Sequence, residues 1–290
     1  MKKGEGMSSN IKSELFFLKQ FGFSNRLLEE IYLSEKAPLF IVFSKNEEIC
    51  KKFKFSKKDR KLSEYVEEYD KFKSNFFKEE EFLKKNSINK IYFKYDKTLL
   101  SNLIPQKKMP LFMYSKGNIN LLEESVKRVA IVGTRKPTKK SVSITEKIVK
   151  KYIKDDYVIV SGLAEGIDTV SHEVALSQSG RTIAVLPTNF KKIYPKENKK
   201  LADNILKKGL LLTAIGPNEH TFKSNFLDRN QYVASICDFI IVTETSLKSG
   251  TMNTIRNAYE ANKKIFYVKQ DDFEVNAKIE SFGGICLDGY

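Results

Sequence analysis

Apolar residues recur every three or four positions in the first part of the chain. Residues 11–21 and 25–35 show this spacing, and residues 62–85 show it over a longer run. One apolar face with a period of about 3.6 residues is typical of amphipathic helices that pack against one another. The pattern therefore predicts a small all-helical domain over residues 1–87.

From residue 88 onward the pattern changes to short, almost purely apolar runs, separated by segments with helical spacing. The runs include RVAIVGT, YVIVSG, TIAVLP, LLLTAI, FIIVTE and KIFYVK. Strands that are buried on both faces of a parallel sheet have this composition. Strands that alternate with helices predict a doubly wound α/β fold, so we expect a mostly parallel sheet over residues 88–290.

Four motifs follow the ends of these predicted strands, where doubly wound sheets bind their ligands. In the first, Gly133 ends a strand, Thr134 and Arg135 occupy the turn, and Lys136 leads toward a helix. Backbone N–H groups at a helix start, beside a guanidinium, suit a phosphate group. The turn matches neither the dinucleotide-binding nor the Walker A pattern, so a purely structural turn is the alternative interpretation.

The second motif, SGLAEGIDTVSH at residues 161–172, joins a predicted strand to a helix. Gly162 and Gly166 permit a tight turn and a close approach of the backbone to a ligand. Asp168 suits the positive N-terminus of the helix, and His172 lies one turn further on the same face. A nearby serine could suggest a catalytic triad, but the G-x-S-x-G elbow is absent. We therefore interpret Asp168 and His172 as structural residues and expect no catalytic residue.

The third motif places Lys223 and Phe226 about one helical turn apart, followed by Arg229 and Asn230. An aromatic ring between cations can stack on an unpaired base while the cations hold its phosphates. The same spacing also fits a core phenylalanine beside a solvated lysine. Both interpretations stay open on this motif alone.

The fourth motif is a small-residue turn at Ser249 and Gly250, between a predicted strand and a helix. A helix that begins after such a turn offers a second N-terminus with room for a phosphate.

The chain is strongly basic, with a formal net charge of +15 that is spread over both halves. This excess favours a polyanionic partner, although a lysine-rich host composition would produce the same charge. Residues 51–61 form a local basic cluster. It is either a solvated connection between helices or an extension of a path for nucleic acid. The three cysteines have no metal-ligand spacing, and no apolar stretch is long enough to span a membrane, so we expect a cytoplasmic protein without a metal.

In order along the chain, the motifs resemble those of the DNA-processing protein DprA (Smf) family. The matching stretches are VGTR at 132–135, SGLAEGIDTVSH at 161–172, AVLPTNFKKIYP at 184–195, FLDRNQ at 226–231, TETSLKSGT at 243–251 and NAKIESFGG at 276–284. The resemblance covers residues 88–290. The helical part is similar to the sterile-alpha-motif-like domain of the family only in length and character.

This resemblance implies an extended Rossmann-like domain that binds single-stranded DNA without reading its sequence. It also implies protection of incoming DNA in natural transformation and recombination, delivery to the RecA recombinase, a homodimer and no cofactor. Arg135 and Lys223 would hold phosphate and Phe226 would stack on a base. The other residues expected at the DNA are Gly133, Thr134, Lys136, Gly162, Gly166, Arg229, Asn230, Ser249 and Gly250.

The chain departs from the family pattern at Pro187 and Asn189, which replace two glycines, and at Gln231, which replaces an arginine. Fewer cations and glycines predict weaker or altered binding. Two other functions stay open. The first is a sensor that binds a free nucleotide at the same strand ends. The second is a nucleotide N-glycosidic hydrolase, although Glu260 falls too late in the sequence for its usual carboxylate.

Overall fold

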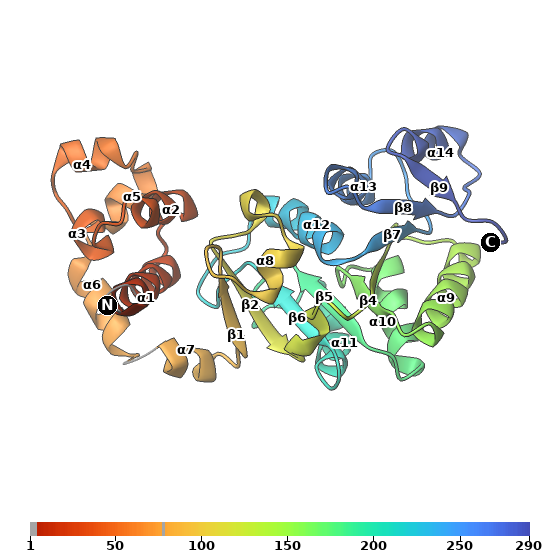
Figure 1. Ribbon diagram of the computed structural model, residues 1–290, viewed down its shortest axis with the longest axis horizontal. Helices are drawn as coiled ribbons and strands as arrows, with labels where there is room; N and C mark the ends of the chain where they lie inside the picture. Colours follow the sequence, from red (N-terminus) through yellow and green to blue (C-terminus); the bar gives the residue numbers. More distant parts are fainter. Residues whose placement is uncertain (1–4, 77–78) are drawn as a thin grey trace.

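The N-terminal part of the chain is helical in the computed structural model, which describes residues 5–76 and 79–290. Its helices are α1 (Glu5–Phe21), α2 (Asn25–Leu33), α3 (Pro38–Val42), α4 (Glu47–Lys52), α5 (Lys57–Leu62), α6 (Val66–Ser74) and α7 (Glu79–Lys85). Figure 1 shows them beyond the β1 edge of the sheet, at the opposite end from the C-terminus.

Aromatic side chains fill the space between these helices and continue onto the sheet. The ring of Phe16 packs edge-on against Phe82 of α7 and Phe112 of strand β2 (Phe112–Gly117), with centroids 5.1 and 5.8 Å apart. Buried side chains of the helices and of β1 (Lys90–Phe93) and β2 form one apolar cluster. Secondary structure changes from helix to strand after α7, and a domain boundary at residue 87 stays a prediction.

The described strands form one nine-stranded sheet in the order β1-β2-β6-β5-β4-β3-β7-β8-β9. Besides β1 and β2 it contains β3 (Arg128–Val132), β4 (Val158–Ser161), β5 (Thr182–Leu186), β6 (Leu210–Thr213), β7 (Phe239–Val242), β8 (Lys264–Tyr267) and β9 (Gly284–Cys286). Neighbours from β6 to β9 pair in parallel, whereas β2 is antiparallel to both β1 and β6. The predicted mostly parallel α/β sheet is thus confirmed.

Helices cover both faces of the sheet, because alternate residues of each buried strand point to opposite sides. Ala130 and Val132 belong to the cluster that includes α8 (Leu99–Leu103), α12 (Ser224–Ile236), α13 (Gly250–Glu260) and α14 (Phe273–Glu280). Val129 and Ile131 pack on the other face against α9 (Lys139–Lys154) and α10 (Ile167–Ser177), and α11 (Lys199–Ile205) lies beside them under β5 and β6. Short 3-10 turns span Gln106–Lys108, Ile119–Leu122 and Lys196–Asn198.

The strand order reverses between β3 and β7. From β3 the chain runs outward through β4, β5 and β6, then returns so that β7 pairs with the other side of β3. The connections that leave the two strands therefore diverge to opposite sides, which opens a crevice at their carboxyl ends. Ligands of doubly wound sheets bind at such a switch point.

Candidate nucleic-acid interface

A cavity of about 450 Å³ lies at this switch point. Its lining comes from the end of β3, from the turns after β3, β4 and β7, and from α10, α12 and α13. The lining residues are Val132, Gly133, Thr134, Arg135, Lys136, Gly162, Ala164, Asp168, Arg229, Asn230, Val233, Ser249, Gly250, Thr251 and Thr254. Nine of the twelve residues that the sequence predicts at the DNA are among them.

The turn after β3 is fixed from two sides. The backbone N–H of Thr134 donates to the Glu244 carbonyl at 2.7 Å, and the Ile167 N–H donates to the Thr134 carbonyl at 3.1 Å. Gly166, with a φ of +75°, packs against this turn. A Cβ at this position would overlap the Thr134 carbonyl oxygen. Gly166 therefore holds the turn in place and is not among the residues that line the cavity, and its direct approach to DNA stays a prediction.

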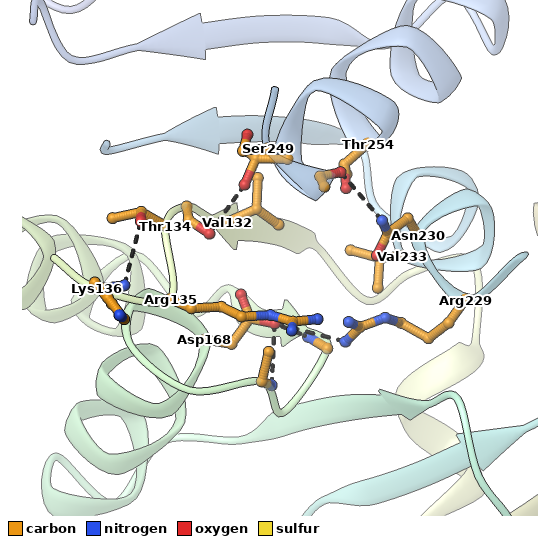
Figure 2. Close-up of a pocket in the computed structure, with 15 residues that line it drawn as sticks. Val132, Thr134, Arg135, Lys136, Asp168, Arg229, Asn230, Val233, Ser249 and Thr254 are labelled. Atoms are coloured by element: carbon orange, nitrogen blue, oxygen red, sulfur yellow. Dashed lines mark hydrogen bonds and ion pairs between the residues drawn. The ribbon is translucent and has the colours of Figure 1, made fainter. Parts of the chain in front are cut away.

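Two guanidinium groups face each other across the cavity, as Figure 2 shows for Arg135 and Arg229. Arg229 is 5% exposed, and within the described part of the chain its Nε and Nη1 have no hydrogen-bond partner. Burial and the positive charge of Arg135 lower the pKa of Arg229, whereas Asp168, 3.5 Å from Nη1, opposes this shift. A buried arginine with unused donors is a site for an anion.

Gly162 provides the space for the Arg229 guanidinium. A Cβ at position 162 would overlap Nη1 and Cζ of Arg229. The Asp168 carboxylate accepts hydrogen bonds from the N–H groups of Gly162 and Ala164 at 3.1 and 3.2 Å, which fixes the turn after β4. We expected Gly162 to let a ligand approach the backbone. The structure shows that the glycine also accommodates an arginine, and the approach of a ligand stays a prediction.

His172 lies inside the domain rather than in the cavity lining. Its Nδ1 is 2.7 Å from the Thr182 hydroxyl, and its side chain is fully buried. Burial, together with the charge of Arg229, lowers the pKa of His172 to about 3. The imidazole is therefore neutral near pH 7. Its assignment as a structural residue stays a prediction.

The third and fourth motifs meet where α12 passes the start of α13. The side-chain amide of Asn230 donates to the Gly250 carbonyl at 3.1 Å. Ser249 precedes α13 without capping it, and its hydroxyl lies 2.5 Å from that of Thr245. The N-terminus of α13 thus opens onto the cavity, where the helix dipole favours negative charge.

A smaller cavity of about 50 Å³ adjoins the first and shares Arg135 and Arg229 with it. Phe226 lines it together with Tyr194, whose ring packs edge-on against Phe226 at 5.2 Å. Sequence reasoning did not single out Tyr194, although it lies in the matching stretch that ends at Pro195. Lys223 lies outside both linings, exposed just before α12.

The three residues that depart from the family pattern each have a defined place in the structure. The side-chain amide of Gln231 donates to the Lys108 carbonyl at 2.9 Å, so this position holds a neighbouring loop instead of facing the cavity. Pro187 lines the smaller cavity, and the Asn189 amide donates to the Glu219 carbonyl at 3.3 Å.

Residues 90–280 match the model of the family described as DNA recombination-mediator protein A. The chain belongs to this family. Among relatives in this family, DNA processing protein DprA of Streptococcus pneumoniae is 39% identical over 159 residues, which cover 55% of each chain. That of Bacillus subtilis is 35% identical over 165 residues, covering 57% of this chain and 55% of the relative. The chain thus spans about half the length of the curated relatives it matches.

Two solved structures of the family resemble the fold. The S. pneumoniae DprA structure has a TM-score of 0.69 and 27% identity, and the match covers 95% of this chain and 94% of that one. DNA processing protein A from Helicobacter pylori, a protein with a single-stranded DNA binding mode, has a TM-score of 0.58 and 32% identity. That match covers 63% of this chain and 85% of the other.

No described helix is long and apolar enough to cross a membrane. Across the same residues, no group of three or more His, Cys, Asp or Glu side chains is arranged to hold a metal ion.

Proposed function

We propose that this protein binds single-stranded DNA, without reading its sequence, at the switch-point cavity and the smaller cavity beside it. One observation carries the proposal. Arg229 is buried with unused donors opposite Arg135, which is an arrangement suited to a phosphate and costly without one. The single-stranded DNA binding mode of the H. pylori relative supports this choice of anion.

Each part of the site makes a different contact with the DNA strand. The guanidinium groups of Arg135 and Arg229 hold a phosphate, together with backbone N–H groups at the start of α13. Phe226, beside Tyr194, stacks on a base, which is possible only where the strand is unpaired. Lys223 adds a phosphate contact at the exposed start of α12. No bond is made or broken, so the protein acts as a binding protein and not as an enzyme.

Membership of the family supports the finer assignments. We infer that the protein protects incoming single strands in natural transformation and recombination and delivers them to the RecA recombinase in the cytoplasm. We infer further that it acts as a homodimer, and that residues 1–87 and 88–290 form its two domains. These assignments go beyond DNA binding, and the residues proposed to bind the DNA stay the same.

Fluorescence anisotropy with labelled oligo-dT and a matched duplex, over a salt series, tests the proposal. The wild type should prefer the single strand, and both Arg135→Ala and Lys223→Ala should weaken binding. Each substitution should also flatten the salt dependence by about 0.7 units, because each phosphate contact releases counterions. Lys264→Ala, at the exposed start of β8, is the control and should bind like the wild type.

If the substitutions leave oligo-dT binding unchanged, or if only mononucleotides bind, the proposal is wrong. The free-nucleotide sensor then becomes the better assignment, because it predicts one deep site with little salt dependence.

A further inference from the structure

A second large cavity, of about 460 Å³, lies between the helical part and the segment that leads into α12. The helical part contributes the α1–α2 turn and Lys58 of α5. The other wall includes Ala214, Ile215, Asn218, Glu219, His220, Phe222, Asn225, Asp228 and Tyr232. We call it the interdomain cavity.

The basic stretch 51–61 is a folded corner and not a flexible connection. Phe53 and Phe55 are buried between α4 and α5. Asp59, 1% exposed, accepts hydrogen bonds from the N–H and hydroxyl of Ser24 at 2.9 and 2.8 Å and forms a capping box with Ser56. The one acidic group of the stretch is thereby used inside the fold, and the lysines remain on the outside.

The corner presents cations that have no counter-ion. Arg60 pairs with Glu47 at 2.8 Å. The exposed lysines have no ion-pair partner among residues 5–76 and 79–290, and they are Lys51, Lys52, Lys54, Lys57, Lys58 and Lys61. We call this set the lysine corner. Lys58 brings its charge to the lining of the interdomain cavity.

One short segment joins the interdomain cavity to the proposed DNA site. Phe222 is 63% exposed and lines the interdomain cavity, and Phe226 lines the smaller cavity beside Arg135. Lys223 lies between the two rings along the chain and is exposed. A strand that stacks on Phe226 therefore has a second ring and further cations within reach along the same segment.

The charges in the lining of the interdomain cavity balance, so the excess of cations comes from the other lysines of the lysine corner. Glu219 is paired with Lys19 at 2.6 Å, and both side chains are 12% exposed. Asp228 is the other acidic group in the lining and stands against Lys58, whereas the other lysines of the lysine corner lie outside the lining.

We propose that the single strand leaves the smaller cavity over Lys223 and enters the interdomain cavity, where Phe222 stacks on a base and the lysine corner holds phosphates. The inference rests on the proposed function and extends it to the helical part, which thus carries part of the DNA path. Alternating rings and cations are the pattern by which proteins bind single strands without sequence preference.

Strand length separates the two sites experimentally. Oligo-dT of about 4 nucleotides fills only the switch-point site, whereas about 16 nucleotides reach both, as in other single-strand grooves. Phe222→Ala and the double variant Lys57→Gln/Lys58→Gln should bind the short strand like the wild type. They should bind the long strand about 10-fold more weakly, and the double variant should lose about 1.4 units of salt dependence.

The same measurements with short and long oligo-dT include a control variant and show which results would overturn the inference. Phe40→Ala removes a ring that is 67% exposed elsewhere in the helical part and should bind both lengths like the wild type. Wild-type affinity that does not rise with length would overturn the inference, and so would variants that bind the long strand like the wild type. If Arg135→Ala weakens both lengths in that case, the switch-point site stands alone. If Arg135→Ala weakens neither, the proposed function itself is wrong.

Discussion

The two ends of strand β3 each have a buried arginine beside them, and the two arginines are used in opposite ways. Arg128, at the amino end, is 2% exposed. Its Nε donates to the Ile236 carbonyl at 2.8 Å, and its Nη1 donates to the carbonyls of Glu123 and Leu121 at 2.8 and 3.2 Å. Arg229, beside the carboxyl end, is buried almost as completely and makes no such bond from Nε or Nη1 among the described residues.

Burial lowers the pKa of both guanidinium groups, and a nearby aspartate opposes the shift in each case. Desolvation is therefore common to the two ends, and hydrogen bonding is what differs. Where the donors are satisfied, a buried arginine holds loops together. Where they are unused, the protein retains a cost in stability, which Asp168 offsets in part and a bound anion would reduce further. The difference predicts that Arg128 serves folding and Arg229 serves binding.

Arg128→Met should produce the largest effect, and it should be an effect on folding. The substitution leaves two buried carbonyl groups and one partly buried one without their donor, so we expect the free energy of unfolding to fall by about 3–5 kcal/mol. Urea titration followed by circular dichroism measures this. The fraction that remains folded should bind oligo-dT with wild-type affinity, and a fall in that affinity would contradict the assignment.

Arg229→Met should show the reverse pattern. We expect a loss of about 100-fold in affinity for oligo-dT, because a charged hydrogen bond to phosphate contributes roughly 1.5–3 kcal/mol. The free energy of unfolding should fall by no more than about 1 kcal/mol, because the buried guanidinium no longer has to be desolvated and Asp168, although it loses this ion pair, keeps its hydrogen bonds to the Gly162 and Ala164 N–H groups. Anisotropy and urea titration, run side by side on both arginine variants, give the comparison. Equal losses of stability in the two variants would contradict it.

His172 extends the comparison to pH, because the positive charge of Arg229 helps to keep it neutral. The pKa of His172 is about 3 in the folded protein, against an ordinary value of 6.5. As the pH falls, the unfolded chain therefore binds a proton at this residue before the folded protein does. The stabilisation is complete above about pH 6.5 and is lost as the pH falls toward 3. Between about pH 7.5 and pH 5, we expect this group to reduce the free energy of unfolding by about 2 kcal/mol.

Urea titrations at the two pH values check this against His172→Asn, which cannot titrate and should lack that loss. His220→Asn is the matched control, because the chain has two histidines and His220 is exposed. The control should retain the full pH dependence of the wild type. If His172→Asn also retains it, the buried imidazole is not the titrating group.

The fold was predictable because each buried strand is a nearly uncharged apolar run and each covering helix has one apolar face. The strand-end motifs also predicted most of the cavity lining, since parallel strands bring their carboxyl ends to one edge. Other features depend on side chains from segments far apart in sequence. No local pattern shows that Nε and Nη1 of Arg229 lack hydrogen-bond partners among the described residues, that Gly162 makes room for this side chain, or that Tyr194 contacts Phe226.

Gly162→Ala should produce a smaller loss of oligo-dT affinity than Arg229→Met. The glycine substitution keeps Arg229 but changes the position of its guanidinium. The added Cβ would overlap the Arg229 guanidinium, so the side chain must move away from Asp168 and further into the cavity. Because Arg229 can move to more open space, we expect little change in stability and about a 10-fold loss of oligo-dT affinity.

Gly250→Ala is the control in the same cavity, where the nearest atom, Nδ2 of Asn230, lies 3.8 Å from an added Cβ. This variant should keep the Arg229 position and most of the affinity. Equal losses in the two glycine variants would mean that any methyl group in the cavity blocks DNA. A loss in Gly162→Ala alone would show that the orientation of Arg229, and not its charge alone, distinguishes the carboxyl end of β3 from the amino end.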